Sequence, residues 1–398
     1  MHFRGAQRTS ARRPQAGRVS AIVATLILIV GLFVPASTLA ATTTISGKVT
    51  DTGGAALSGI TVQPGTISAS AFTAVGSSAT TAGDGSYSVT VGDGRFAIRF
   101  SEGSQAHAMG FYSSAGFVVD AGSATTILAT GGAVTGINVR MPVTHLITGT
   151  VTGNLGVALN NVTVAALTIA GNQVVTATTN VSGVYNLHVA SGTYVVRFNP
   201  SGGSGYPSGY YTVSGLTTDL SAAAHIAVGS SDSTGKDIQL PLARTIQGTV
   251  TDPSSAPLAG ITVSAGLSTT TTSAGGTYTL SVPPGSYRVT FQDLSNALPS
   301  GFYSTGGFTA SFSGATLVDV NSGPQVGINV QLPTGVAMTG TVTGAAGAGL
   351  AGINVWLIPT GTTNPLSIVT TSPGGTYSIP AAAGTFIVKF VENTGAYS

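Results

Sequence analysis

The 398-residue sequence contains no cysteine, one tryptophan and only 7% charged residues. The lack of cysteine excludes disulfides, thiol chemistry and a lipid-anchoring cysteine, so cores alone must hold the domains together. The scarcity of charge leaves a surface solvated mainly by hydroxyl groups and backbone. Glycine is abundant, with 56 residues, and serine, threonine and alanine accompany it.

The first forty residues differ from the remainder. They contain five arginines, an apolar run over residues 21–34 and then small residues up to Ala40 and Ala41. This pattern predicts a signal peptide for general secretion over residues 1–40, and therefore a secreted, extracellular or cell-surface protein. The apolar run is short for a stable membrane span, although an uncleaved anchor is an alternative. We expect no membrane span beyond this segment.

Removal of the signal peptide changes the net charge. The segment holds five of the fourteen basic residues and none of the twelve acidic ones. The mature chain then carries nine basic and twelve acidic side chains, a net charge of about −3. No basic patch remains, and nucleic acid is therefore not an expected partner.

A seventeen-residue pattern occurs four times, with G-x-Y at its start and an aromatic, x, apolar, x, Phe run at its end. In each copy two alternating segments are separated by a short turn, and alternation with period two is typical of strands that bury one face. The third copy has Pro283, Pro284 and Gly285 at the turn, which predicts a β-hairpin. The copies are DGSYSVTVGDGRFAIRF (from Asp84), SGVYNLHVASGTYVVRF (from Ser182), GGTYTLSVPPGSYRVTF (from Gly275) and GGTYSIPAAAGTFIVKF (from Gly374).

Other segments repeat in the same register. A first strand contains Gly47, Gly149, Gly248 or Gly340, and a closing strand reads GINVRMP, KDIQLPL or GINVQLP. A period of about a hundred residues is the size of a small domain, and about seven short strands per period indicate an immunoglobulin-like β-sandwich. The sequence thus predicts an all-β tandem array after the signal peptide. The predicted repeats are 44–143, 144–242, 243–333 and an incomplete fourth repeat over 336–398.

The fourth repeat ends where the third still needs about thirty residues to finish its closing strand. A sandwich without its last strands has an unpaired edge and an open core. Either the chain is a truncated version of a longer protein, which we favour, or something else completes the last repeat.

The motifs I-x-G-x-V-T, L-x-G-I-x-V, G-x-Y-x-L and P-G-x-Y-x-V-x-F together resemble the carboxypeptidase regulatory-like domain. This resemblance covers nearly all of residues 44–398. It implies a transthyretin-like or starch-binding-like sandwich, related to the B-type repeats of Gram-positive adhesins. Such domains serve as stalks, spacers and binding modules, and they accompany polysaccharide-degrading enzymes, so an amylase-type label can arise by association.

The ionisable residues do not suggest an enzyme, a metal site or a cofactor site. The four histidines after the signal peptide are scattered, and no carboxylate recurs in all four repeats, whereas glycoside hydrolysis needs a facing pair. We therefore predict no catalytic residues, no cofactor and no metal. Two smaller alternatives are an isopeptide bond between Lys48 and Asn138 and a calcium site that uses Asp84 with Asp93 or Asp51.

Exposed aromatic rings can stack on sugars, and an aromatic pair follows a glycine in three repeats. Adjacent residues of an extended chain point to opposite sides, so one ring of each pair should be buried and the other exposed. We predict a non-catalytic stalk, adhesive or carbohydrate-binding module whose partner is a polysaccharide or cell-surface glycan. The alternative is an accessory carbohydrate-binding chain of an amylase-like system. The candidate glycan contacts are Phe111, Tyr112, Tyr210, Tyr211, Phe302 and Tyr303.

Overall fold

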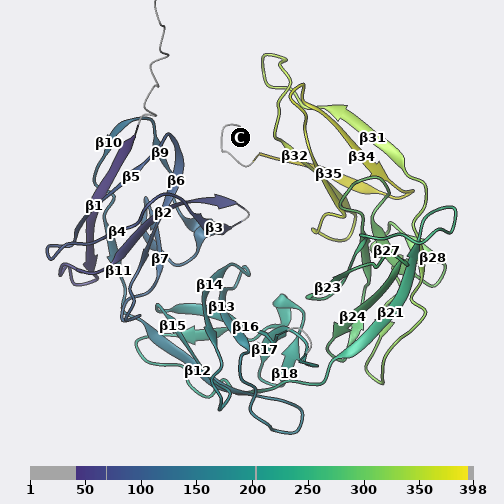
Figure 1. The fold of residues 1–398 in the computed structure, drawn as a ribbon, viewed down its shortest axis with the longest axis horizontal. Coiled ribbons are helices and arrows are strands. Elements are labelled where there is room, and N and C mark those ends of the chain that lie inside the picture. The colour runs from purple at the N-terminus through teal and green to yellow at the C-terminus, as the bar shows by residue number, and fades with distance from the viewer. Residues whose placement is uncertain (1–41, 69, 202–203, 393–398) are drawn as a thin grey trace, which may run out of the picture. The chain divides into compact units, whose positions relative to one another are not determined.

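The computed structural model describes residues 42–392 except 69 and 202–203. The predicted signal peptide lies outside the described residues. The described chain consists of β-strands and two short 3-10 helices, Ala121–Ser123 and Leu220–Ala222 (Figure 1). This confirms the predicted tandem array of β-sandwiches. No helix in the described part of the chain has the length and apolar character that crossing a membrane requires.

The first two repeats have nearly the same strands in the same order. The first contains β1 (Thr43–Asp51), β2 (Thr61–Ser68), β3 (Ala71–Ala74), β4 (Ala79–Thr80), β5 (Ser86–Val91), β6 (Gly94–Ser101), β7 (Gly110–Ser113), β8 (Gly116–Val118), β9 (Ile127–Ala129), β10 (Gly132–Val134) and β11 (Val139–Met141). The second contains β12 (His145–Thr152), β13 (Thr163–Thr168), β14 (Gln173–Thr178), β15 (Val184–Val189), β16 (Gly192–Asn199), β17 (Gly209–Thr212), β18 (Gly215–Thr217), β19 (Ile226–Val228) and β20 (Ile238–Gln239).

The third repeat keeps this order, and the described residues of the fourth form strands that correspond to its first part. The third contains β21 (Arg244–Thr251), β22 (Thr262–Ala265), β23 (Ser268–Thr271), β24 (Thr277–Val282), β25 (Ser286–Tyr287), β26 (Thr290–Gln292), β27 (Gly301–Ser304), β28 (Gly307–Thr309), β29 (Val318–Asp319) and β30 (Val330–Gln331). The fourth contains β31 (Val336–Thr341), β32 (Asn354–Pro359), β33 (Ser367–Thr370), β34 (Thr376–Ala381) and β35 (Phe386–Val391).

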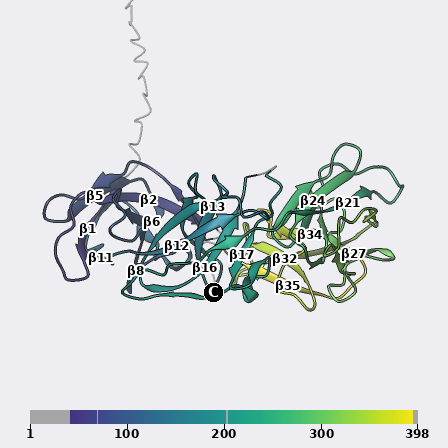
Figure 2. The same cartoon turned by 90° about the horizontal axis from the view of Figure 1, so that it is seen from below.

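Each of the first three repeats is built from two main sheets. In the third, β21 pairs antiparallel with β24 and parallel with the closing strand β30, and the facing sheet has the order β23-β22-β26-β27-β28. Figures 1 and 2 both show β21 beside β24. The core lies between the sheets, and it includes Tyr278, Leu280 and Phe291, which are at most 4% exposed.

The predicted hairpin is wrong. β24 pairs with β21, whereas β26 pairs with β22 and β27, so the turn at residues 283–285 connects two sheets instead of two neighbouring strands. The apolar faces of both segments point into the space between the sheets. Crossing from one sheet to the other buries both of those faces against each other.

The G-x-Y tyrosines are core residues in the first three repeats. Tyr278 packs edge-to-face on Phe291 with 5.7 Å between ring centroids, and its hydroxyl donates a 2.7 Å hydrogen bond to the closing-strand carbonyl of Ile328. Burial raises the pKa of this phenol well above its usual value. The first two repeats make the same ring contact and hydroxyl bond, with Tyr87 and Tyr185 in the place of Tyr278.

The glycine of each first strand lies directly opposite this tyrosine. Gly248 pairs with Tyr278, and a Cβ atom at Gly248 would overlap the carbonyl oxygen of Ile328. Gly47 and Gly149 are equally close to their own closing strands. The glycine thus allows two backbones to approach where a side chain would keep them apart.

Candidate functional site

The second ring of each predicted aromatic pair faces the sandwich core. Tyr112 and Tyr303 are half-buried against the cores of the first and third repeats, and Tyr211 is 8% exposed in the core of the second. The first rings, Phe111, Tyr210 and Phe302, are 5–7% exposed. Side chains therefore cover both sides of each pair. The role of these six residues in glycan binding stays a prediction.

Side chains on the outer face of the sheet cover the first rings. In the first repeat, Phe111 lies 5.4 Å from Phe72, and the Arg99 guanidinium lies 4.7 Å from the centre of the Phe72 ring. In the third repeat, Phe312 contacts Phe302 at 5.7 Å while Arg288 lies 4.2 Å above the Phe312 ring. Each cluster combines two aromatic rings with a cation, an arrangement that electrostatic attraction to the ring face stabilises.

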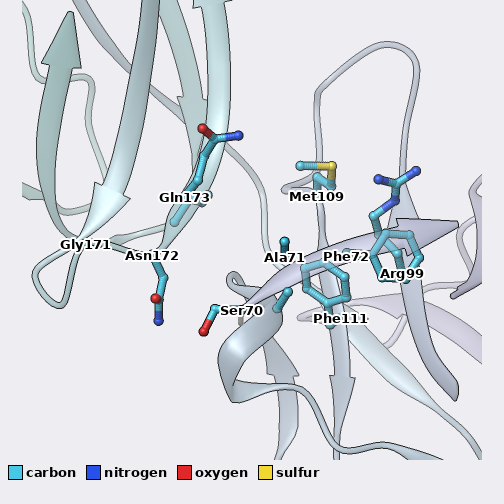
Figure 3. A pocket seen from close by; sticks show the side chains of 11 residues that line it. Ser70, Ala71, Phe72, Arg99, Met109, Phe111, Gly171, Asn172 and Gln173 are labelled. Carbon is cyan, nitrogen blue, oxygen red and sulfur yellow. The ribbon is translucent and has the colours of Figure 1, made fainter. Parts of the chain in front are cut away.

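The cluster of the first repeat borders a cavity of about 430 Å³. Figure 3 shows Phe72, Phe111 and Arg99 on one side of it and Asn172 and Gln173 on the other. Burial lowers the pKa of Arg99, and its buried Nε atom has no hydrogen-bond partner among the residues that the structure describes. The cavity thus combines aromatic surface with a guanidinium group and two amides. Of the six predicted contacts, it contains Phe111 alone.

One imidazole and one carboxylate meet in the first repeat. The Nδ1 atom of His107 and the Oε2 atom of Glu102 lie 2.9 Å apart, and the backbone N–H of His107 donates to the same oxygen. Burial opposes ionisation of Glu102, but hydrogen bonds from His107 and Ser104 outweigh it, so the pKa of Glu102 is lowered. Within the described residues, no three His, Asp or Glu side chains form a group able to hold a metal ion.

The candidate crosslinking and calcium residues make structural contacts. Asn138 Oδ1 accepts a 2.8 Å hydrogen bond from the backbone N–H of Lys48, whose ammonium group lies 3.7 Å from the carboxylate of Asp84. Asp84 also accepts from Ser86, and Asp51 accepts from the backbone N–H of Ala55. These bonds stabilise turns and the contact between the first and closing strands.

Sequence reasoning missed a threonine six residues before each G-x-Y tyrosine. In the second repeat, the Oγ1 atom of Thr179 donates to the carbonyl of Leu159 and accepts from the N–H of Val162. The equivalent residues Thr81, Thr272 and Thr371 each accept from a buried backbone N–H. The fixed spacing to tyrosine was a signal that could have identified this residue.

Residues 245–333, which span the third repeat from β21 to just beyond β30, match the family model of the carboxypeptidase regulatory-like domain. This segment is a carboxypeptidase regulatory-like domain. The match confirms the resemblance drawn from the motifs. The other repeats share with this carboxypeptidase regulatory-like domain the Gly–Tyr strand pair and the tyrosine–phenylalanine contact.

No curated protein matches the chain. Solved structures with some similarity include the Bacillus anthracis TIE protein, with 11% identity and a TM-score of 0.23 over 74% of this chain and 51% of that one. They also include a streptococcal ancillary pilin, with 10% identity and a TM-score of 0.24 over 73% of this chain and 98% of the pilin. The chain spans about half the length of the B. anthracis protein.

Proposed function

We propose that this chain is a non-catalytic, secreted or cell-surface repeat protein whose β-sandwich domains serve as a stalk or adhesive spacer. The observation that carries the proposal is the repetition of structural contacts. Tyr87, Tyr185 and Tyr278 each bond a closing-strand carbonyl, whereas among the described residues the Glu102–His107 pair has no counterpart outside the first repeat. The contacts that recur in these repeats are therefore contacts that hold the β-sandwich together.

A direct test is an assay of the purified chain against a panel of polysaccharides and peptides. We expect no product above a buffer control. Product formation that disappears in Glu102→Gln or His107→Gln would overturn the non-catalytic assignment. These two variants address the imidazole–carboxylate pair, and Asp93→Asn at an exposed position is the matched control.

Export is tested separately. N-terminal sequencing of the protein from the culture medium or cell surface should show cleavage after Ala40 or Ala41, in agreement with the predicted signal peptide. Retention of the full-length chain in the cytoplasm would contradict the proposed location and leave the sandwich fold unaffected.

Carbohydrate binding is a second candidate function, favoured by the cavity beside Arg99. The partly exposed Phe72 ring can contact a sugar, and the guanidinium and amide groups of the cavity can bond hydroxyls. We infer that a polysaccharide ligand would contact Arg99, Asn172 and Gln173. The same site would serve an accessory chain of a polysaccharide-degrading system.

Retention on immobilised polysaccharides tests this candidate. We expect Gln173→Ala with Asn172→Ala to reduce retention, while Arg288→Ala leaves it unchanged. Arg288 is a matched control because it stacks on Phe312 in the third repeat as Arg99 stacks on Phe72. A chain that no polysaccharide in the panel retains acts as a stalk without this site.

A further inference from the structure

A polar groove lies on the outer face of one sheet of the first repeat. β1 and the closing strand β11 are paired neighbours in this sheet, and both bury alternate residues (Figure 2). The residues between the buried ones, Lys48 and Thr50 on β1 and Asn138 and Arg140 at β11, therefore point outward. Together with Phe117 of β8 they line a cavity of about 430 Å³, which is within the size range of small-molecule sites.

The guanidinium of Arg140 lacks the structural role that the equivalent side chains have. In the second and third repeats a glutamine, Gln239 or Gln331, takes this position, and its Nε2 atom donates to backbone carbonyls of the turn after the first strand. Among the residues that the structure describes, none forms an ion pair or hydrogen bond with the exposed side chain of Arg140. A planar group with five N–H donors therefore remains for a ligand outside the chain.

A second cation, Lys48, lies on the neighbouring strand. Threonine takes its place in the next two repeats, at Thr150 and Thr249. The Lys48 ammonium lies 3.7 Å from the carboxylate of Asp84, and the two side chains are 58% and 61% exposed. Such an exposed ion pair contributes little to stability, so the ammonium can turn toward a ligand at low cost.

The uncharged groups of the groove suit a sugar. The Oδ1 atom of Asn138 accepts a 2.8 Å hydrogen bond from the backbone N–H of Lys48, so its Nδ2 group is the part that can donate to a ligand. The Phe117 ring is partly exposed and packs against the first core. An apolar ring beside a few convergent polar groups is typical of a ligand site, and the two cations favour a negatively charged ligand.

We propose that this groove binds a carboxylate-bearing sugar, the uronate unit of an acidic polysaccharide. Arg140 pairs with the carboxylate through two parallel N–H···O bonds, and Lys48 supplies a second positive charge. Phe117 contacts the sugar ring, while Asn138 and Thr50 bond its hydroxyl groups. The site lies within the first repeat, goes beyond the stalk function and depends neither on that function nor on the cavity beside Arg99.

The test measures retention of the full chain on immobilised polygalacturonate. We expect retention at low ionic strength that is lost at about 1 M salt, where the Debye length is about 3 Å. The matched ligand is the same polymer after reduction of its carboxylates to alcohols, and it should not retain the chain. Equal retention on the reduced polymer, or no retention on either polymer, would overturn the proposal.

Competition separates a uronate site from a general anion site. Free galacturonate should elute the chain from the polymer at concentrations at which inorganic phosphate and sulfate do not, because only the sugar acid also uses the Phe117 ring and the groups that bond hydroxyls. Elution by phosphate or sulfate at the same concentration as by galacturonate would overturn the assignment to a sugar carboxylate.

Two substitutions locate the site. Lys48→Thr and Arg140→Gln give the first repeat the residues that the third repeat has at these positions, so the sandwich should stay folded. Each removes charge-assisted bonds and should weaken binding by about tenfold or more. Arg95→Gln removes the same charge from an exposed position on β6 and is the matched control, which should leave binding unchanged.

The variants also separate this groove from the cavity beside Arg99. Equal affinity of Arg140→Gln and the unaltered chain, or an equal loss in Arg95→Gln, would overturn the assignment. Retention that falls in Gln173→Ala with Asn172→Ala but not in Arg140→Gln would belong to the cavity beside Arg99, and it would also overturn the assignment.

Discussion

Gly248 and Tyr278 are cross-strand partners that meet the same atom. The Tyr278 hydroxyl donates to the carbonyl oxygen of Ile328, and the missing side chain of Gly248 leaves room for that oxygen. The pair therefore joins β21, β24 and the segment that leads into the closing strand β30. Two sequence motifs more than twenty residues apart form one structural unit.

Replacing Tyr278 with phenylalanine should weaken the third repeat. The change removes a buried hydrogen bond and leaves the Ile328 carbonyl without this donor, at a cost of about 1 kcal/mol. Hydrogen exchange of the β21 amides measures the effect locally. Tyr377→Phe is the matched control, since no hydrogen bond of this hydroxyl appears among the described residues, and it should change exchange in β31 little. Equal effects of the two variants would show that the hydrogen bond to Ile328 does not account for the loss.

Replacing Gly248 with alanine should have a larger effect. The new Cβ atom overlaps a backbone oxygen, so β30 must move away and weaken its contacts, at a cost of about 1–3 kcal/mol. In Gly340→Ala only the Tyr377 ring must shift. We expect that variant to unfold at nearly the same denaturant concentration as the unaltered chain. If Gly248→Ala lowers the free energy of unfolding only slightly, the closing strand can shift to make room for the new side chain.

The buried threonine gives a third prediction. Thr179→Val keeps the shape of the side chain but removes both of its hydrogen bonds, which leaves the Val162 N–H without its partner. The free energy of unfolding of the second repeat should fall by about 1–3 kcal/mol. Thr179→Ser keeps the hydroxyl and should recover most of the loss. A Thr179→Ser variant as unstable as Thr179→Val would show that the hydroxyl alone does not account for the contribution of Thr179.

Local alternation was enough to predict the strands and that each buries one face. The strand around Tyr278 buries every second residue, and this pattern is visible in the sequence. The partner of each strand was not visible, because a hairpin and a crossing between sheets need the same alternation. Residues 283–285 form a turn in both cases, and only the non-local pairing of β24 with β21 separates them.

The surroundings of the aromatic pairs were also hidden in the sequence. Because the backbone is extended there, Phe302 and Tyr303 are expected to point to opposite faces of the sheet. That Phe312 covers the Phe302 ring depends on how a later loop returns to the sheet, which the sequence does not reveal. The structural role of Thr179 was not predicted for another reason. Threonine is frequent throughout the chain, so its recurrence at one fixed position is difficult to recognise in the sequence. The Gly–Tyr pair is predictable because glycine and tyrosine recur at a constant spacing.

Asp293 should make the stability of the third repeat depend on pH. Its carboxylate is 8% exposed and accepts hydrogen bonds from Ser295, Ala297 and Leu298. Burial opposes ionisation, but these bonds outweigh it, so the pKa of Asp293 is lowered from its ordinary value of 3.8. The folded state therefore favours the ionised form. Its stabilising effect is complete above the unfolded-state pKa and is lost as pH falls through the lower folded-state value.

Asp293→Asn tests this dependence. The variant loses charge-assisted bonds to the turn, so its free energy of unfolding should be lower by about 1–3 kcal/mol at pH 7. The difference should shrink below about pH 4 as the wild-type carboxylate takes up a proton. Denaturant unfolding of the third repeat at several pH values measures it. Asp93→Asn at an exposed turn is the control and should leave the free energy of unfolding at pH 7 nearly unchanged. A difference between Asp293→Asn and the wild type that is constant from pH 7 to pH 2 would rule out a contribution from the Asp293 charge.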